Sequence, residues 1–395
     1  MNSSQAQLII ESLRKGIPPE GFVRHFTVGR EGEITDLRQR LNTHNGTVLL
    51  LKANYGSGKT HLLKFIREEA LEQNYAVSSV TLDANSGVRF NRMDQIVGAV
   101  CRNIEVPGKA GEKGLSPLMD YLADKINKGI ADNPFFQTLS NHGRWDYSEV
   151  LDSKAMYVAI RAWSTGIQSV QDMISDWFYN PSAYNSQRIL LLKALITDLR
   201  SQFRDPRPDW KFYDDDVFVM NKNGYEQSWA LLRDINTLCK EAGLSGFIIM
   251  FDEFEDVITN LRRINYQETA FWNLFHFYAG KMFPGKTFYA VTPEFVDKCK
   301  SVLLLKQRWD FDYTRFDKLP MYSMSPLETS EMEELALLIF EVHGIAYDWE
   351  PDTIMLDSQL KSIVRKAAAV KIQDRVRKVI ITVVEALDAL LQESI

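Results

Sequence analysis

The chain has 395 residues, enough for two or three domains with large hydrophobic cores. Its charged and apolar fractions, 25% and 45%, are those of an ordinary soluble protein, and no apolar run reaches the roughly 20 residues of a membrane-spanning helix. The net charge of −6 excludes a uniformly basic nucleic-acid-binding protein, so any surface for nucleic acid is local or built from several subunits.

The start of the chain and its cysteines favour the cytoplasm. Residues 1–7 lack a basic region followed by an apolar core, so we expect no signal peptide. Cys101, Cys239 and Cys299 are widely spaced and form no CxxC pair, and the histidines are scattered. This pattern argues against a disulfide framework, a zinc site or a histidine metal cluster.

The first hundred residues alternate between helix and strand signals. Apolar spacing predicts helices over 5–14, 31–41 and 61–73, and strands over 47–53 and 75–83. Such alternation predicts a parallel sheet with helices on both faces.

A phosphate-binding loop is predicted between the first strand and its helix. Residues 53–60 read Ala-Asn-Tyr-Gly-Ser-Gly-Lys-Thr, in which alanine replaces the usual first glycine. Gly56 and Gly58 allow successive N–H groups to turn toward a phosphate, and the following helix adds its positive end. Lys59 then reaches the β- and γ-phosphates, and the Thr60 hydroxyl binds Mg²⁺. The alternative is a glycine-rich turn that binds nothing, which the strand–loop–helix context disfavours.

Residues 105–222 carry few strand signals and predict a helical insertion, with helices over 115–128, 155–174 and 187–203. The insertion is rich in aromatic residues, which could stack on bases or pack in a core or against a partner protein. Packing is the favoured interpretation, because basic residues are not concentrated there. These residues are Phe135, Phe136, Trp145, Tyr147, Tyr157, Trp163, Trp177, Phe178, Tyr179 and Tyr184.

A buried strand that ends in two acids follows the insertion. Residues 246–255 read Gly-Phe-Ile-Ile-Met-Phe-Asp-Glu-Phe-Glu. The carboxyl ends of parallel strands are where such sheets bind ligands, so we expect Asp252 to hold Mg²⁺ and Glu253 to polarise an attacking water. The alternative is a solvated acidic turn that also includes Glu255 and Asp256. The phosphate loop upstream favours the site.

A third strand, over 287–291, stops at Thr292 and Pro293. Thr292 is placed to contact a γ-phosphate or the water, or it merely caps the turn.

The end of the chain is helical. Apolar spacing from residue 325 onward predicts helices over 329–342, 357–368 and 374–391. The stretch 361–378 is rich in lysine and arginine and is the best local candidate for nucleic-acid contact. A solvated helix face is the favoured alternative.

Together these elements predict an α/β fold: a three-layer P-loop core with a parallel sheet, a helical insertion and a C-terminal all-helical lid. Residues 1–104 and 223–320 are the two parts of the core, 105–222 the insertion and 321–395 the lid.

Five sequence segments carry a family resemblance. The segment at 26–34, Phe-Thr-Val-Gly-Arg-Glu-Gly-Glu-Ile, resembles the entry segment of origin-recognition-like and signalling AAA+ ATPases. Together with 55–63, 89–104, 251–256 and 292–295, it resembles the ATP-binding proteins of BREX-type phage-defence loci, of the BrxD kind. The likeness covers most of the chain.

The resemblance implies an AAA+ ATPase that binds MgATP between core and lid. Thr60 and Asp252 match metal-binding positions, Glu253 the catalytic base and Thr292 sensor 1. Arg375 lies at the lid's sensor-2 position, although Asp374 replaces the usual preceding proline. The ATP-binding positions are Val28, Arg30, Tyr55, Gly56, Ser57, Gly58, Lys59, Thr60 and His61.

Arg308 and Arg315 are the candidates for an arginine finger, which would contact the nucleotide of a neighbouring subunit. The alternative is that each forms an ordinary surface ion pair. A finger implies a homo-oligomer.

The expected function is ATP hydrolysis coupled to assembly on DNA or on other defence-system proteins, without a membrane. One alternative is a nucleotide-gated switch that binds ATP with little hydrolysis. The other is a small-molecule or nucleotide kinase, for which the sequence marks no acceptor pocket.

Overall fold

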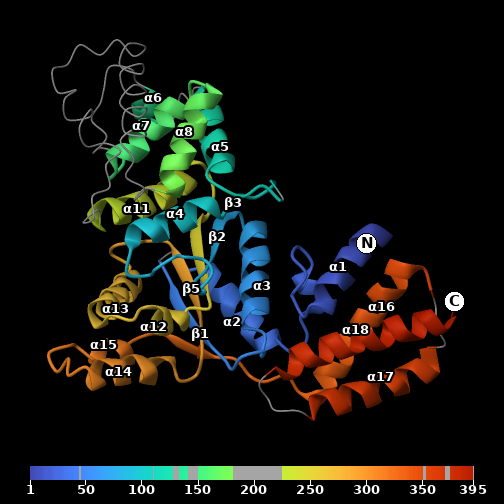
Figure 1. The fold of residues 1–395 in the computed structure, drawn as a ribbon. Helices are drawn as coiled ribbons and strands as arrows, with labels where there is room; N and C mark the ends of the chain where they lie inside the picture. Colours follow the sequence, from blue (N-terminus) through green and yellow to red (C-terminus); the bar gives the residue numbers. More distant parts are fainter. Residues whose placement is uncertain are drawn as a thin grey trace, which may run out of the picture.

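The computed structural model describes residues 1–43, 46–109, 111–127, 133–140, 150–180, 225–349, 353–369 and 374–394 (Figure 1). Its centre is a six-stranded sheet with the order β3-β2-β4-β5-β1-β6, parallel except for β3. This confirms the predicted α/β fold with a mostly parallel sheet. The strands are β1 (Val48–Lys52), β2 (Tyr75–Thr81), β3 (Ile104–Glu105), β4 (Gly246–Asp252), β5 (Lys286–Val291) and β6 (Met321–Ser323).

The strand order gathers the three predicted motifs at one edge of the sheet. β5 lies between β1 and β4 and pairs in parallel with both, with Lys52 opposite Val291. Because parallel strands end at the same edge, the phosphate loop after β1, Thr292 after β5 and Asp252 at the end of β4 lie along that edge.

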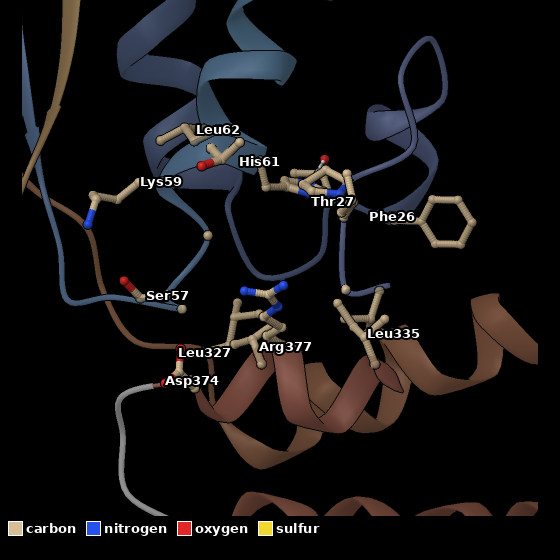
Figure 2. Close-up of a pocket in the computed structure, with 18 of the residues that line it drawn as sticks. Phe26, Thr27, Ser57, Lys59, His61, Leu62, Leu327, Leu335, Asp374 and Arg377 are labelled. Carbon is tan, nitrogen blue, oxygen red and sulfur yellow. Dashed lines mark hydrogen bonds between the residues drawn. The ribbon is translucent and has the colours of Figure 1, made fainter. Parts of the chain in front are cut away.

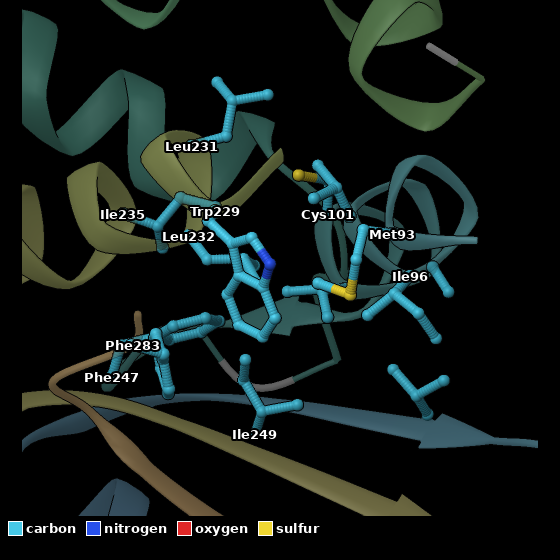
Figure 3. Close-up of a cluster of buried hydrophobic side chains, with 14 of the residues drawn as sticks. Met93, Ile96, Cys101, Trp229, Leu231, Leu232, Ile235, Phe247, Ile249 and Phe283 are labelled. Carbon is cyan, nitrogen blue, oxygen red and sulfur yellow. The ribbon is translucent and has the colours of Figure 1, made fainter. Parts of the chain in front are cut away.

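Helices bury both faces of the sheet, as the alternation of strand and helix predicts. On one face, α2 (Glu31–Leu41) and α3 (Lys59–Glu72) pack on alternate strand residues that include Leu49 and Met250. On the other face lie α4 (Met93–Arg102), α11 (Tyr225–Glu241) and α13 (Ile264–Ala279). There the fully buried Trp229 of α11 reaches toward Ile249 (Figure 3). Residues of β4 that point to opposite faces therefore belong to two different cores.

The described helices of the predicted insertion share a core with the sheet. They are α5 (Ser116–Asn127), α6 (Pro134–Ser140), α7 (Lys154–Trp163) and α8 (Gln168–Tyr179). The single helix predicted over 155–174 is wrong, because the chain turns after Trp163 and Gly166 adopts φ 71°. The helix predicted over 187–203 lies outside the described residues.

The aromatic residues of this region pack inside the protein wherever the structure describes them. Tyr157, Trp163, Trp177 and Phe178 are at most 2% exposed, and they belong to the same hydrophobic cluster as Phe136. Phe135 and Tyr179 pack against that cluster, while Trp145, Tyr147 and Tyr184 lie outside the described residues. Core packing therefore accounts for the described aromatic residues, as expected.

The lid bundle consists of α16 (Thr329–Tyr347), α17 (Thr353–Ala368) and α18 (Arg375–Ser394), joined by the N-terminal helix α1 (Ser3–Arg14) (Figure 1). The apolar face of α1 packs on α16 and α18. Arg14 donates two hydrogen bonds to Asp388 of α18, 3.0 and 2.9 Å long. Thus α1 packs with the lid helices, and β6, which follows residue 320, pairs with β1 of the sheet.

Short elements complete the described fold. They are η1 (Val23–Phe26), α12 (Asp256–Asn260), α14 (Phe295–Leu305) and α15 (Thr314–Asp317). No described helix combines the length and the apolar composition required to cross a membrane.

Candidate nucleotide-binding site

A cavity of about 330 Å³ opens where the phosphate loop, the segment before α2 and the lid bundle meet (Figure 2). Its size is within the range of small-molecule sites. All nine residues expected to bind ATP line it, and so does Glu253. Asp252, Thr292, Arg308, Arg315 and Arg375 are not among its lining residues.

The phosphate loop has the backbone that its sequence predicts. Gly56 and Gly58 have φ values of 69° and 94°, and α3 begins directly after Gly58. A Cβ on Gly56 would also lie only 2.4 Å from the Cα of Asp374, the residue before α18. The Asp374 N–H donates to the Tyr55 carbonyl oxygen at 3.3 Å. The lid bundle therefore touches the loop itself, and position 56 requires glycine for two reasons.

Arg30 supports the phosphate loop from the entry segment. Its side chain is only 6% exposed and donates to Glu33 at 3.0 Å and to the Ser57 carbonyl oxygen at 3.3 Å. It also donates to the carbonyl oxygen of Ser325, in the segment that leads to the lid bundle. The Arg30 guanidinium thus connects the entry segment, the phosphate loop and the start of the lid by hydrogen bonds.

His61 lines the cavity as an uncharged side chain. Its Nε2 lies 2.8 Å from the Thr27 hydroxyl, which donates its single hydrogen to the Val23 carbonyl oxygen. The His61 ring therefore carries its hydrogen on Nε2. Loss of solvation lowers the pKa of His61 to about 4, and the charges of Arg30 and Lys64 add to this effect. His61 consequently brings no positive charge to the site at neutral pH.

Lys59 is buried at the first turn of α3, with 7% of its surface exposed. Its Nζ donates to the Ala53 carbonyl oxygen at 3.2 Å and lies 3.4 Å from Oε1 of Glu255. In Figure 2 its side chain points away from Arg377 and the lid bundle. From the sequence, Glu255 is expected only as part of an acidic turn, without a role in binding.

The two acids at the end of β4 face different surroundings. Asp252 is the last strand residue, and its Oδ1 accepts a hydrogen bond from the Glu253 N–H at 3.0 Å. Glu253 lines the cavity and has φ 53°, a conformation rare for a non-glycine residue. Such backbone conformations concentrate at functional sites.

Thr292 follows β5 and is 3% exposed. Its Oγ1 is buried and has no hydrogen-bond partner among the described residues. A buried hydroxyl without a partner is unusual in proteins, and Thr292 is not among the residues that line the cavity.

Two lid arginines lie near the loop. Arg377, which is not among the residues predicted for the site, lines the cavity and extends from α18 toward the loop in Figure 2. Arg375 lines a smaller adjacent hollow with Lys52 and Pro293, and its Nε is buried without a hydrogen-bond partner among the described residues. The spacing of two residues turns these side chains to different sides of the helix.

Both candidates for an arginine finger form ion pairs within their own chain. Arg308 binds Glu268 through two nitrogens and also donates to Asn265 at 3.2 Å. Arg315 donates to Asp312 at 3.1 Å and lies over the Trp272 ring, 4.5 Å from its centre. To act on a neighbouring subunit, either side chain has to leave these partners.

The comparisons with known proteins bear on the same residues. The family model described as "BREX system ATP-binding protein BrxC/D" matches residues 1–153 and 217–394. The chain belongs to this family. Comparison with curated proteins and with solved structures gave no match.

Family membership identifies an ATP-binding protein of the BREX anti-phage system, as the sequence resemblance implies. The matched residues include both halves of the sheet, the phosphate loop and the lid bundle. They leave out 154–216, although α7 and α8 from that stretch are packed into the common core.

Proposed function

We propose that this BREX protein is an AAA+ ATPase that hydrolyses MgATP and couples the reaction to self-assembly on DNA or on other defence proteins. The observation that carries the proposal is the shared edge of the sheet, where the phosphate loop, Thr292 and Asp252 follow three neighbouring strands. The lid bundle also lies against the phosphate loop through Asp374.

The residues at this edge fit a magnesium ion. The Thr60 hydroxyl and the Asp252 carboxylate are hard oxygen ligands, and Mg²⁺ is commonly held by one or two such groups together with substrate phosphates and water. Among the described residues there is no cluster of three or more His, Cys, Asp or Glu that could hold a metal alone. When bound, Mg²⁺ neutralises charge on the phosphates.

In this proposal each side chain has a distinct task. The N–H groups of the loop and Lys59 bind the phosphates, and Glu253, which lines the cavity, accepts a proton from the attacking water. The orphan hydroxyl of Thr292 orients that water or the γ-phosphate.

The two lid arginines should differ in their effect on ATP binding. Arg377→Ala is expected to weaken ATP affinity about tenfold, the effect of losing one charge-assisted hydrogen bond, because Arg377 lines the cavity. Arg375→Ala should weaken it less, because Arg375 lines the adjacent hollow. Calorimetric titration with MgATP measures both. A larger loss in Arg375→Ala would instead support Arg375 as the sensor-2 residue.

Assembly is tested by light scattering behind gel filtration. The Glu253→Gln variant, used to prevent turnover, should form an oligomer with MgATP and enlarge further with duplex DNA. A monomer under every condition would argue against a finger in trans.

The intramolecular ion pairs of Arg308 and Arg315 favour the second candidate function, a nucleotide-gated switch with little hydrolysis. Turnover that stays unchanged when duplex DNA is added would support this switch.

A further inference from the structure

Lys59 is held by three groups of the protein. Its Nζ lies 3.2 Å from the Ala53 carbonyl oxygen, 3.4 Å from Oε1 of Glu255 and 4.7 Å from the centre of the Tyr55 ring. These contacts draw the ammonium to the side of the loop that faces away from the lid bundle (Figure 2). An ammonium has three hydrogens, so each such contact limits what is left for phosphate oxygens.

The charged form of Glu255 is stabilised by Lys59, because the carboxylate is buried and gains little from water. Glu255 is 5% exposed, and its Oε1 lies 3.4 Å from Nζ of Lys59. Burial raises the pKa of Glu255, while the charge of Lys59 acts in the opposite direction. A buried carboxylate without a cation is costly, and Lys59 is the cation that Glu255 contacts.

Glu255 is also distinct from Glu253, the acid proposed as the base. Glu253 lines the cavity, whereas Glu255 does not. Its charge is therefore directed at Lys59 and not at the cavity. Lys59 also lines the cavity, so a phosphate that binds its ammonium has to weaken this buried ion pair, which opposes binding.

We propose that Glu255 competes with the β- and γ-phosphates of ATP for Lys59 and so lowers the affinity of the site. This inference rests on the proposed function of Lys59 as a phosphate ligand. It gives the third acid of the Asp-Glu-Phe-Glu sequence a role as a positioning residue that restrains nucleotide binding until the phosphates displace it.

The test is the affinity of Glu255→Gln for nucleotides. The amide keeps the shape of the side chain and removes its charge, so MgATP and MgADP should bind about tenfold more tightly or better. AMP lacks the phosphates that Lys59 reaches, so its affinity should stay within about twofold of the parent. Calorimetric titration measures all three. Glu294→Gln, an exposed acid after β5, is the matched control and should change none of them.

Unchanged or weaker MgATP binding in Glu255→Gln would overturn the competition, and so would an equal gain for AMP, which would indicate a general change of the cavity. If neither the parent nor the variant bound MgATP, the proposed function would fail together with this inference. Should circular dichroism show that Glu255→Gln is unfolded, Glu255→Asp replaces it. The shorter acid should reach Lys59 less well and tighten MgATP binding by a smaller factor, and an unchanged affinity would count against the proposal.

Discussion

Lys59→Ala is expected to abolish ATP binding, weakening it by about 100-fold or more. The substitution removes the cation from the phosphates, where charge-assisted hydrogen bonds contribute about 1.5–3 kcal/mol each. Calorimetric titration with MgATP measures the loss. The same experiment with Lys298→Ala, an exposed lysine paired with Glu294, should give the parent affinity.

The loss has to be separated from unfolding, because Lys59→Ala also leaves Glu255 buried without its cation. Thermal melting followed by circular dichroism reports whether the variant is folded at the titration temperature. A folded Lys59→Ala protein whose affinity stays within threefold of the parent would show that the loop does not bind phosphate as proposed.

Glu253→Gln is expected to retain MgATP binding within about threefold and to lose turnover by about 10²- to 10⁴-fold, the usual contribution of a general base. The reason is that Glu253 lines the cavity beside the loop, where an amide can keep its place but cannot accept the proton. Release of inorganic phosphate under saturating MgATP measures turnover, and calorimetry measures binding.

The matched control for this variant is Glu294→Gln, which makes the same chemical change on the exposed turn after β5. It should hydrolyse ATP like the parent. Equal turnover in Glu253→Gln and in the parent would mean that another residue, or no residue, acts as the base.

The contact between lid and loop suggests how the two variants relate to assembly. Asp374 touches Gly56, and Arg30 joins the loop to Ser325 at the start of the lid. A phosphate bound at the loop therefore acts on groups that position the lid bundle. Loss of binding in Lys59→Ala should for that reason also remove any nucleotide-dependent change in oligomeric state.

The sheet and the phosphate loop follow from local signals in the sequence. The motif at 53–60 fixes its own local structure, because its glycines, its flanking strand and its helix all act between near neighbours. The apolar runs that form β1, β4 and β5 are also local signals, because each predicts a strand from neighbouring residues alone. The family resemblance likewise rests on short sequence segments. The nine residues expected to bind ATP all line one cavity.

Other features depended on contacts between distant segments. The pattern of α1 predicts an apolar face but cannot name its partner, which proved to be α16 and α18, more than 300 residues away. The apolar spacing over 155–174 continues across the turn, so the sequence predicts one helix there. The turn at Gly166 is stabilised by the packing of α7 against α8. Tertiary contacts override local propensity in such cases.

The pairing of charged side chains also depends on long-range packing. Glu255 and Asp374 are ordinary acids in the sequence, yet one pairs with Lys59 and the other lies against Gly56. Arg377, and not Arg375, lines the cavity, because the direction of a side chain on α18 depends on how that helix packs on the lid bundle. Local sequence sets the chemistry that is available to this protein. Burial and long-range packing decide which groups are brought within a few ångströms of one another, and therefore which of them compete.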